Sequence, residues 1–413
     1  MRSFMKLRLM GMMFLQFFIW GSWYATGGNY MKSHGMTDVI YLVYLASPIG
    51  SIVSPFFLGM IADRFFAVEK LMGVMHLLSG IFLLCAPWLG ATSPVIFLSF
   101  MFLHMLCYMP TVGLASATAF HLVGDKEKEF PVIRVFGTFG WIGAGFIVSY
   151  LLQGDTTALP MYVAGAGSLL MGLYSFTLPH IPPRGAGKKV LFRDVIGLDV
   201  LKQFTSRPFI VFILGLLLIS IPFASYFAYV PIFLTSANIS DPAFKMSFGQ
   251  MSEVIFLLLM PWFFKRFGIK WVLIMGLLAW VIRYGLFAMA APNAVAWMMI
   301  AGILVHGACY DFVYVASQVY IDKNISPAFR AQAQGFFVLV SYGVGQGLGT
   351  LAAGFIFNSI MSGDNATAAQ WQTFWLIPLL FAVVVTLMFV FGFKEKLQLS
   401  KKEAVTDEQV ENF

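Results

Sequence analysis

The sequence predicts an all-α integral membrane protein whose twelve membrane-spanning helices form two bundles of six. Composition is the first observation: of 413 residues, 59% are hydrophobic and 11% are charged, whereas about a quarter of the residues are charged in soluble proteins. Second, apolar stretches of roughly 20 residues, the length that spans a bilayer, recur about twelve times. Third, a polar segment in the middle of the chain separates six of these stretches from the other six.

The expected helices follow one another with short connections. In the first bundle, residues 1–182, they cover approximately 9–31, 38–62, 71–90, 95–121, 131–153 and 161–181. In the second bundle, residues 208–393, they cover approximately 208–236, 247–268, 270–291, 294–321, 335–360 and 371–393. Residues 183–207 are expected to form a cytoplasmic linker. Residues 394–413 form a highly charged cytoplasmic tail, to which we assign no function.

The distribution of basic residues predicts the orientation of the protein in the membrane. Of the 26 Lys and Arg residues, 22 fall on the side of the N-terminus, Lys32 and Lys245 fall on the other side, and Arg134 and Arg283 fall within apolar stretches. Because cytoplasmic loops carry the excess of basic residues, both termini are expected in the cytoplasm. The same bias accounts for the net charge of +7 without nucleic acid as a partner.

An apolar stripe runs through the expected linker. The sequence RGAGKKVLFRDVIGLDVLKQF places apolar residues beside basic ones, namely Val190, Val195, Leu198, Leu201 and Phe204. This pattern is typical of a short helix that lies on the membrane surface, here tethering the two bundles. A regulatory or partner-binding role is the alternative.

Cysteine and histidine residues show no pattern of a disulfide or a metal site. Cys85, Cys107 and Cys309 lie in apolar stretches without paired spacing, as small core residues do. His76 and His104 stand alone on apolar stretches, where a core histidine with satisfied hydrogen bonds is the expected role. The histidines are scattered over different helices and no HExxH motif occurs. We therefore expect no metal, no cofactor and no enzymatic activity.

Two basic loops occupy matching positions in the two halves. GMIADRFFAVEK, Gly59 to Lys70, joins the second and third expected helices, and KRFGIK, Lys265 to Lys270, joins the eighth and ninth. Such an internal repeat is typical of transporters made of two bundles that rock against each other. The first loop resembles the G-x-x-x-D-R motif of the major facilitator superfamily through Gly59, Asp63 and Arg64, without the usual Gly-Arg-Lys continuation.

The stretch PVIRVFGTFGWIGAG, residues 131–145, contains a charged residue in an apolar run. A charge at membrane depth is costly and usually faces a protein interior or a watery cavity. Arg134, Thr138 and Trp141 follow one another at i, i+4 and i+7, so a helix aligns them on one face. This combination of cation, hydroxyl and indole suits a small polar ligand. The alternative is that Arg134 pairs with an acid to lock two helices together.

Two acids lie in apolar stretches of the second half. Glu253 follows Gln250 by three residues, which puts an amide and a carboxyl on one helical face. In VHGACYDFVYV, His306 and Tyr310 share a face and Asp311 lies beside it. Acids at membrane depth are functional candidates by default. The alternatives are that Glu253 is only interfacial, and that Asp311 forms a structural ion pair with Arg283 of the preceding helix.

Glycines punctuate two of the expected helices. They are Gly137, Gly140 and Gly143 in 131–153, and Gly343, Gly345, Gly347 and Gly349 in 335–360. Glycine permits close approach of membrane helices, which an interface that rocks also requires.

Four stretches together resemble the bacterial nucleoside:H+ symporter family of the major facilitator superfamily. They are FLQFFIWGSWY (14–24), EFPVIRVFGTFGW (129–141), QMSEVIFLLLMPWFFKRFGIK (250–270) and YDF (310–312). The resemblance covers nearly the whole chain. It implies the major facilitator fold, two six-helix bundles around a central nucleoside site, and uptake driven by the proton gradient across the bacterial cytoplasmic (inner) membrane.

The resemblance also implies the residues of the site. Arg134, Thr138 and Trp141 match the family's arginine, threonine and aromatic residue in helix 5. Further matches are Gln250 and Glu253 in helix 8 and the aromatic–Asp pair of helix 10, Tyr310 and Asp311. His306 stands where the family has an upstream aromatic residue. In helix 7, where the family has Gln and Asn, IPFASYFAYV offers only Ser225, Tyr226 and Tyr229 as polar groups; of these we take Tyr226 as a candidate.

The chemistry of these residues suits a nucleoside. Trp141 or Tyr310 can stack on a base, Gln250 can both donate and accept, and Glu253 or Asp311 can accept hydrogen bonds from ribose hydroxyls. A buried carboxyl that binds a proton on one side of the membrane and releases it on the other couples the two fluxes, so Asp311 or Glu253 is the expected proton carrier. The expected partners are a nucleoside, H+ and the lipid bilayer, with the protein as a monomer. A major facilitator symporter for another small polar solute, such as a sugar, is the alternative.

Overall fold

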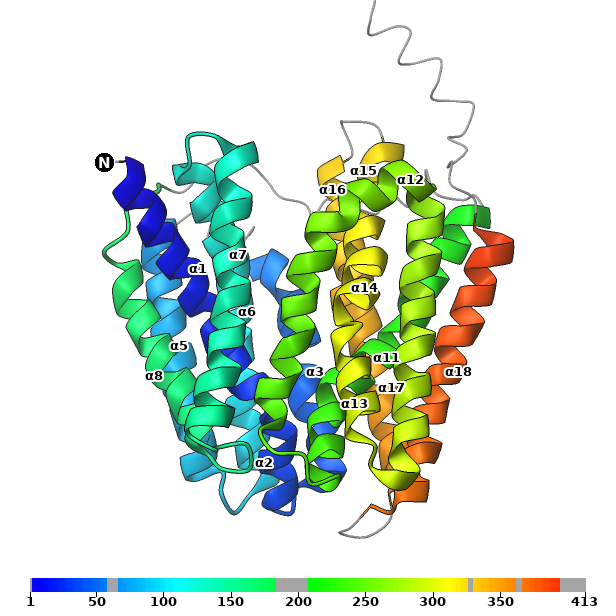
Figure 1. The fold of residues 1–413 in the computed structure, drawn as a ribbon. Coiled ribbons are helices and arrows are strands. Elements are labelled where there is room, and N and C mark those ends of the chain that lie inside the picture. Colours follow the sequence, from blue (N-terminus) through cyan, green and yellow to red (C-terminus); the bar gives the residue numbers. More distant parts are fainter. Residues whose placement is uncertain (1, 58–65, 183–206, 326–329, 362–365, 394–413) are drawn as a thin grey trace, which may run out of the picture.

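The computed structural model describes residues 2–57, 66–182, 207–325, 330–361 and 366–393. All regular elements in these ranges are helices (Figure 1). The expected surface helix of the linker, the tail and the motif residues Gly59, Asp63 and Arg64 lie outside the described residues. By length and composition, 8 helices of the described ranges are suited to cross a membrane, or up to 9 if a bent pair counts as one span.

The helices of the first half overlap the first six apolar stretches. They are α1 (Arg2–Tyr24), α2 (Gly27–Ser33), the 3₁₀-helix η1 (Thr37–Val39), α3 (Ile40–Phe57), α5 (Val68–Leu89), α6 (Pro94–Leu122), α7 (Lys126–Gly145), the π-helix η3 (Phe146–Leu151) and α8 (Leu159–Ser175). α1 and α2 together correspond to the first stretch, and α7 with η3 to the fifth.

The helices of the second half overlap the other six stretches. They are α11 (Arg207–Ser236), α12 (Pro242–Ala290), η4 (Ala291–Asn293), α13 (Ala296–Leu304), α14 (His306–Tyr310), the π-helix η5 (Asp311–Val315), α15 (Ala316–Asn324), α16 (Arg330–Val338), the π-helix η7 (Leu339–Gly345), α17 (Gln346–Ile360) and α18 (Ala368–Gly392).

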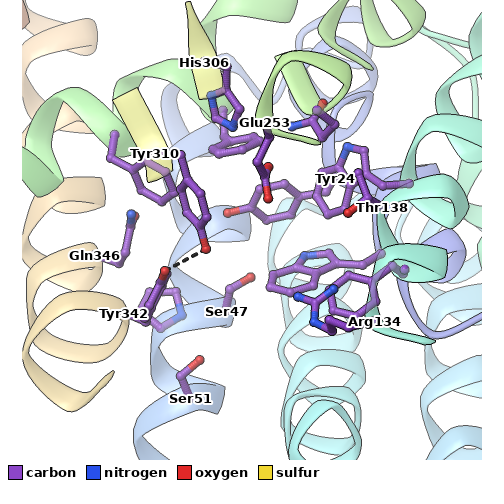
Figure 2. A pocket seen from close by; sticks show the side chains of 18 residues that line it. Tyr24, Ser47, Ser51, Arg134, Thr138, Glu253, His306, Tyr310, Tyr342 and Gln346 are labelled. Atoms are coloured by element: carbon purple, nitrogen blue, oxygen red, sulfur yellow. Dashed lines mark hydrogen bonds between the residues drawn. The ribbon is translucent and has the colours of Figure 1, made fainter. Parts of the chain in front are cut away.

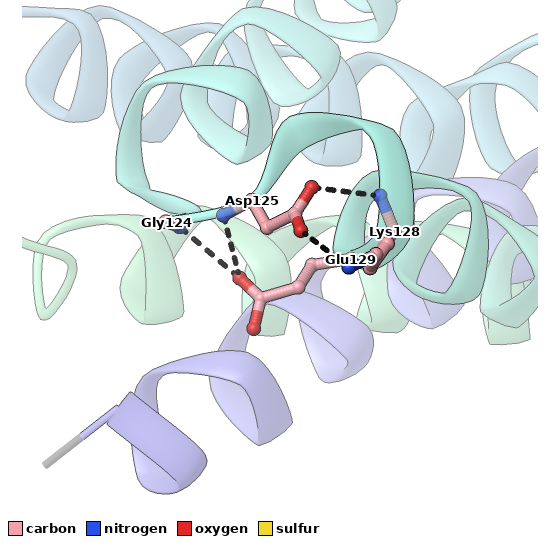
Figure 3. A network of polar contacts seen from close by, with 4 residues as sticks. All are labelled: Gly124, Asp125, Lys128 and Glu129. Carbon is pink, nitrogen blue, oxygen red and sulfur yellow. Dashed lines mark hydrogen bonds and ion pairs between the residues drawn. The ribbon is translucent and has the colours of Figure 1, made fainter.

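A polar cap fixes the start of α7 five residues before the predicted stretch. The Asp125 side chain accepts a hydrogen bond from the backbone N–H of Lys128 at 3.1 Å, and Glu129 Oε2 accepts from the backbone N–H of Gly124 at 3.1 Å (Figure 3). These bonds satisfy N–H groups that have no partner within the helix. The cap therefore holds the beginning of the helix that carries Arg134.

A single glycine separates the two stretches that α12 contains. Gly268 has φ 75° and ψ 168°, a conformation that glycine adopts at little cost and that breaks the helix. The expected loop from Lys265 to Lys270 is therefore a sharp break, with its basic residues at the ends of the two helical segments.

Two π-helical turns interrupt the helices of the second half. η5 begins at Asp311, directly after α14, and η7 ends just before Gln346. A π-turn shifts every later side chain around the helix axis and is frequent at functional sites. In addition, the segments Ala296–Leu304 and His306–Asn324 meet at an angle of 42°. The regular i, i+4 spacing therefore does not hold along the whole of these helices.

The two halves lie side by side, and the start of α1 and the end of α18 lie at the same end (Figure 1). Between described residues, four hydrogen bonds join the halves. They run from Asn29 Nδ2 to the Pro231 carbonyl (3.4 Å), from Lys32 Nζ to Ser236 Oγ (3.5 Å), from the Ala243 amide to Asp155 Oδ1 (3.1 Å) and from Asn358 Nδ2 to the Asp38 carbonyl (2.7 Å). All four lie at the end that contains α2, opposite the start of α1. The halves are therefore closed against each other at that end.

A polar network lies within the core of the first half. His76 Nε2 is 2.9 Å from Gln16 Oε1, and His76 Nδ1 is 3.2 Å from Ser168 Oγ. Gln16 Nε2 donates to Thr111 Oγ1 at 2.9 Å. His104 Nδ1 lies 2.8 Å from Ser79 Oγ. The expectation of satisfied core histidines is confirmed for His76, whose two ring nitrogens both have partners. The two histidines belong to one network, because Ser168 Oγ donates to Ser79 Oγ at 3.4 Å. His104 Nε2 has no partner among the described residues, so the expectation is met only in part for His104.

Candidate substrate site between the two halves

A cavity lies between the halves, lined by residues of α1, α3 and α7 on one side and of α11, α12, α14, η7 and α17 on the other (Figure 2). Its space amounts to about 880 Å³, part of it open to solvent. Half of the lining residues carry aromatic rings, His306 included, and several polar side chains converge on the same space.

The three residues predicted to share one face of α7 all line the cavity. The Arg134 guanidinium lies 4.3 Å from the ring centre of Phe17 in a cation–π contact. Among the described residues, no carboxylate lies within ion-pair distance of Arg134. Trp141 packs edge-to-face on Trp20, with ring centres 5.8 Å apart. The charge of Arg134 is therefore available to a ligand, and no acid in the described ranges locks it to another helix.

Gln250 and Glu253 reach the same cavity from α12. Gln250 is 6% exposed and its Oε1 has no hydrogen-bond partner among the described residues. Glu253 is half-buried and points into the cavity from the second half, whereas Arg134 reaches it from the first half (Figure 2). Since α12 begins at Pro242, Glu253 lies more than ten residues inside the helix. If Glu253 were only an interfacial residue, it would lie closer to the start of the helix.

His306 and Tyr310 of α14 form part of an aromatic wall. Their rings are stacked with centres 5.9 Å apart, as the i, i+4 spacing predicts, and both line the cavity. Phe223 of α11 is stacked on Tyr310 at 6.0 Å. The Tyr310 hydroxyl lies 2.7 Å from that of Tyr342, in a hydrogen bond to η7 (Figure 2). Tyr310 is thus held in place by Phe223 and Tyr342 while it lines the cavity.

Asp311 and Tyr226 lie behind the cavity lining. Asp311 is 1% exposed, and neither of its carboxyl oxygens has a hydrogen-bond partner among the described residues. No ion pair joins it to Arg283 in the described part of the chain. Arg283 instead stacks its guanidinium over the Tyr226 ring at 4.0 Å and donates to the Gly302 carbonyl at 3.0 Å. Tyr226 therefore packs between Arg283 and His306, on which its ring is stacked at 5.0 Å.

Sequence reasoning missed one wall of the site. This wall consists of Ser47 and Ser51 of α3, Tyr342 of η7 and Gln346 of α17. Phe223 and Phe227 of α11 and Trp20 of α1 were missed as well. The only signal for Gln346 was one amide in a glycine-rich apolar stretch.

The geometry suits a flat ligand that is rich in hydrogen-bonding groups. Aromatic rings offer stacking faces, while a guanidinium, a carboxyl, two carboxamides and several hydroxyls surround the same space. Because its groups come from both halves, a relative movement of the halves would take the site apart or assemble it.

Comparison with known proteins agrees with this geometry. Residues 2–398 match the family described as Nucleoside H+ symporter. The chain is 33% identical over 405 residues to the xanthosine permease of Escherichia coli (strain K12), covering 94% of this chain and 96% of the permease. It is 32% identical over 412 residues to the nucleoside permease NupG of the same organism, covering 95% and 96%.

The fold is similar too. The crystal structure of the nucleoside transporter NupG matches with a TM-score of 0.83 and 30% sequence identity, over 94% of this chain and 100% of that chain. The fold is thus that of major facilitator-type transporters, in a multi-pass protein of the bacterial inner membrane, and the relatives are transporters and not enzymes. The chain belongs to the nucleoside H+ symporter family.

Proposed function

We propose that the cavity between the halves binds the nucleoside that this symporter takes up together with a proton. The observation on which the proposal depends is that Arg134, Gln250 and Glu253, from opposite halves, face one cavity. Among the described residues, neither Arg134 nor Glu253 forms an ion pair, and Gln250 Oε1 has no hydrogen-bond partner. Polar groups of this kind are costly to bury unless a ligand or water satisfies them.

The binding mode follows from the placement of the groups. Trp141 and Tyr310 offer aromatic faces to the base, Trp141 from the first half and Tyr310 from the second. Glu253 accepts hydrogen bonds from ribose hydroxyls, and the guanidinium of Arg134 and the hydroxyl of Thr138 complete that charged end. Gln250, with a free carbonyl, meets an N–H or O–H of the ligand. His306 closes the cavity beside Tyr310.

The proton is carried by Asp311 or Glu253. An ionised carboxylate that is buried without a donor is unfavourable, and a bound proton removes the charge. Asp311 has such surroundings directly behind the substrate-lining residue Tyr310, while Glu253 lies in the lining itself. A proton on Asp311 would affect the substrate indirectly, through the lining residue Tyr310. A proton on Glu253 would lie in the substrate site itself, where it would either compete with the ribose or bind together with it.

Transport proceeds by alternating access between two bundles, residues 1–182 and 208–393, joined by the linker 183–207 and followed by the tail 394–413. Twelve spans are consistent with the helices, because α12 contains two segments that meet at Gly268. The positive charge bias puts both termini in the cytoplasm, which makes the α2 end the outer one. The four hydrogen bonds at that end then close the outer side.

Uptake of labelled uridine by proteoliposomes tests the proposal. With an acidic outside medium, the purified protein is expected to accumulate uridine, with competition from other nucleosides and none from sugars. Asp311→Asn or Glu253→Gln is expected to abolish accumulation driven by the pH gradient while exchange of uridine across the membrane continues. Asp38→Asn, an exposed acid outside the cavity lining, is the control. Undiminished accumulation in both carboxyl variants would contradict the role of Asp311 or Glu253 as proton carrier. Competition by sugars would contradict the assignment of the cavity to nucleosides.

A further inference from the structure

The wall of the cavity formed by α3, η7 and α17 has no role in the binding mode above. It contributes Ser47, Ser51, Tyr342 and Gln346 to the lining. Gln346 and Gln250 are the two carboxamides among the lining residues, and they reach the cavity from different helices. α11 contributes only Phe223 and Phe227 to the lining, so no amide comes from that helix.

Gln346 is a buried amide with an unused donor. It is 9% exposed, and its Nε2 has no hydrogen-bond partner among the described residues. A buried N–H group without a partner costs about 1–3 kcal/mol. Since the side chain lines the cavity, a ligand in the cavity is in a position to satisfy it.

The cavity has two chemically different ends (Figure 2). At one end lie Arg134, Thr138 and Glu253, which offer charge and strong hydrogen bonds. At the other lie Gln346 and Tyr342, with Tyr310 between the ends, and this end has no charged group in the lining. Ribose hydroxyls pair best with the charged end. A flat base with alternating donors and acceptors fits the aromatic and amide end.

We infer that Gln346 binds the hydrogen-bonding edge of the base and determines which bases are accepted. The inference rests on the nucleoside site proposed above and deepens it. Tyr342 orients the neighbouring aromatic face through its hydrogen bond to Tyr310. The π-turn η7 ends at Gly345 and therefore sets the direction in which Gln346 leaves the helix. An amide can present its N–H to a carbonyl or its C=O to an amine, so Gln346 accepts both uridine-like and cytidine-like edges.

The test uses two variants of Gln346 and binding of uridine, cytidine and 2′-deoxyuridine to the purified protein. In Gln346→Glu, the carboxylate only accepts hydrogen bonds and repels the base carbonyl of uridine. The ratio of cytidine affinity to uridine affinity is therefore expected to rise about ten-fold, an effect of about 1.4 kcal/mol. In Gln346→Leu, affinity for both ribonucleosides is expected to fall about ten-fold. In both variants the ratio of uridine to 2′-deoxyuridine affinity stays unchanged.

Two controls separate the possible failures. Glu253→Gln is expected to change the uridine to 2′-deoxyuridine ratio and to leave the cytidine to uridine ratio unchanged. If the unaltered protein binds no nucleoside, the proposed function fails. If it binds nucleosides but Gln346→Glu leaves the cytidine to uridine affinity ratio unchanged, the role inferred for Gln346 is wrong, while the nucleoside site is retained. The same conclusion follows if either Gln346 variant changes the uridine to 2′-deoxyuridine affinity ratio. Gln346→Glu retains the size of the side chain and carries the test if Gln346→Leu does not fold.

Discussion

Asp155, in the loop between η3 and α8, accepts a hydrogen bond at 3.1 Å from the backbone amide of Ala243 at the start of α12. This bond crosses from one half of the molecule to the other. Asp155 is 9% exposed and also accepts from Ser149 Oγ at 2.6 Å. Burial raises the pKa of the Asp155 carboxyl above its ordinary value; the two hydrogen bonds oppose the rise and the nearby charge of Asp241 adds to it.

The sign of the pH effect follows from this shift. A carboxyl whose pKa is raised where it is buried binds its proton more tightly there than where it is exposed. The closed arrangement of the α2 end is therefore expected to be most stable below the ordinary carboxyl pKa and to lose stability as the pH rises from that value through the raised pKa. Asp155→Asn, which resembles the protonated acid, is expected to favour closure at neutral pH and to remove this pH dependence.

Distance measurements between spin labels near the start of α8 and the end of α11, both at the α2 end, check this prediction. Asp155→Ala removes the acceptor altogether and is expected to shift the distances toward the open arrangement, because a lost buried hydrogen bond costs about 1–3 kcal/mol. If the measured distances depend on pH equally in the unaltered protein and in Asp155→Asn, a group other than Asp155 is responsible for the pH dependence.

Gly145 allows α7 and α12 to approach closely. A Cβ atom at this position would lie 2.9 Å from the carbonyl oxygen of Ala243 and would also meet Ser247. Gly145→Ala is therefore expected to hinder closure and to slow uridine transport several-fold, while uridine still binds. Gly143→Ala is the matched control, since its Cβ would lie at an ordinary 3.4 Å from Phe14. Equal transport rates in the two variants would count against close contact at Gly145 in the transport cycle.

Arg134 is expected to contribute through its planar guanidinium as well as its charge. Arg134→Ala should weaken uridine binding by at least ten-fold, because hydrogen bonds to charged groups contribute about 1.5–3 kcal/mol. Arg134→Lys retains the charge but loses the forked donor geometry and the stacking on Phe17. It should recover only part of the affinity, as measured by titration calorimetry. Full recovery in the lysine variant would reduce the role of Arg134 to its charge.

The polar network of the first half is expected to be structural. Gln16→Leu leaves His76 Nε2 without its partner, whereas Thr111 Oγ1 loses the bond from Gln16 but still donates to the Tyr108 carbonyl. A buried polar group left unsatisfied costs about 1–3 kcal/mol. The melting temperature of the protein in detergent should fall by several degrees. Ser175→Ala is the control, because Ser175 bonds only to a carbonyl of its own helix. An unchanged melting temperature in Gln16→Leu would mean that water replaces the lost partner.

The helices themselves could be predicted because apolar length alone specifies them. The face of α7 could be predicted as well: Arg134, Thr138 and Trp141 lie on a regular helix, so their spacing translates directly into direction. The pair of His306 and Tyr310 follows the same rule within α14. The roles of these residues stay predictions, as do those of Gln250, Glu253, Asp311 and Tyr226.

Three features could not be read from spacing. Gln346 follows the π-turn η7, which shifts its direction away from the 3.6-residue period. Asp311 begins the π-turn η5 and lies behind the lining instead of in it. The contact of Asp155 with Ala243 depends on how two halves meet, and residues 88 apart in sequence carry no local sign of it.

The closure at the α2 end has a consequence for energy conversion. At about 0.5–1.5 kcal/mol for a net hydrogen bond, the four bonds between the halves amount to a few kcal/mol. A proton that moves down about 100 mV releases about 2.3 kcal/mol, and one pH unit adds about 1.4 kcal/mol. Breaking these four bonds thus requires free energy on the scale that a single proton delivers, and we expect proton movement to offset their loss each time this end opens.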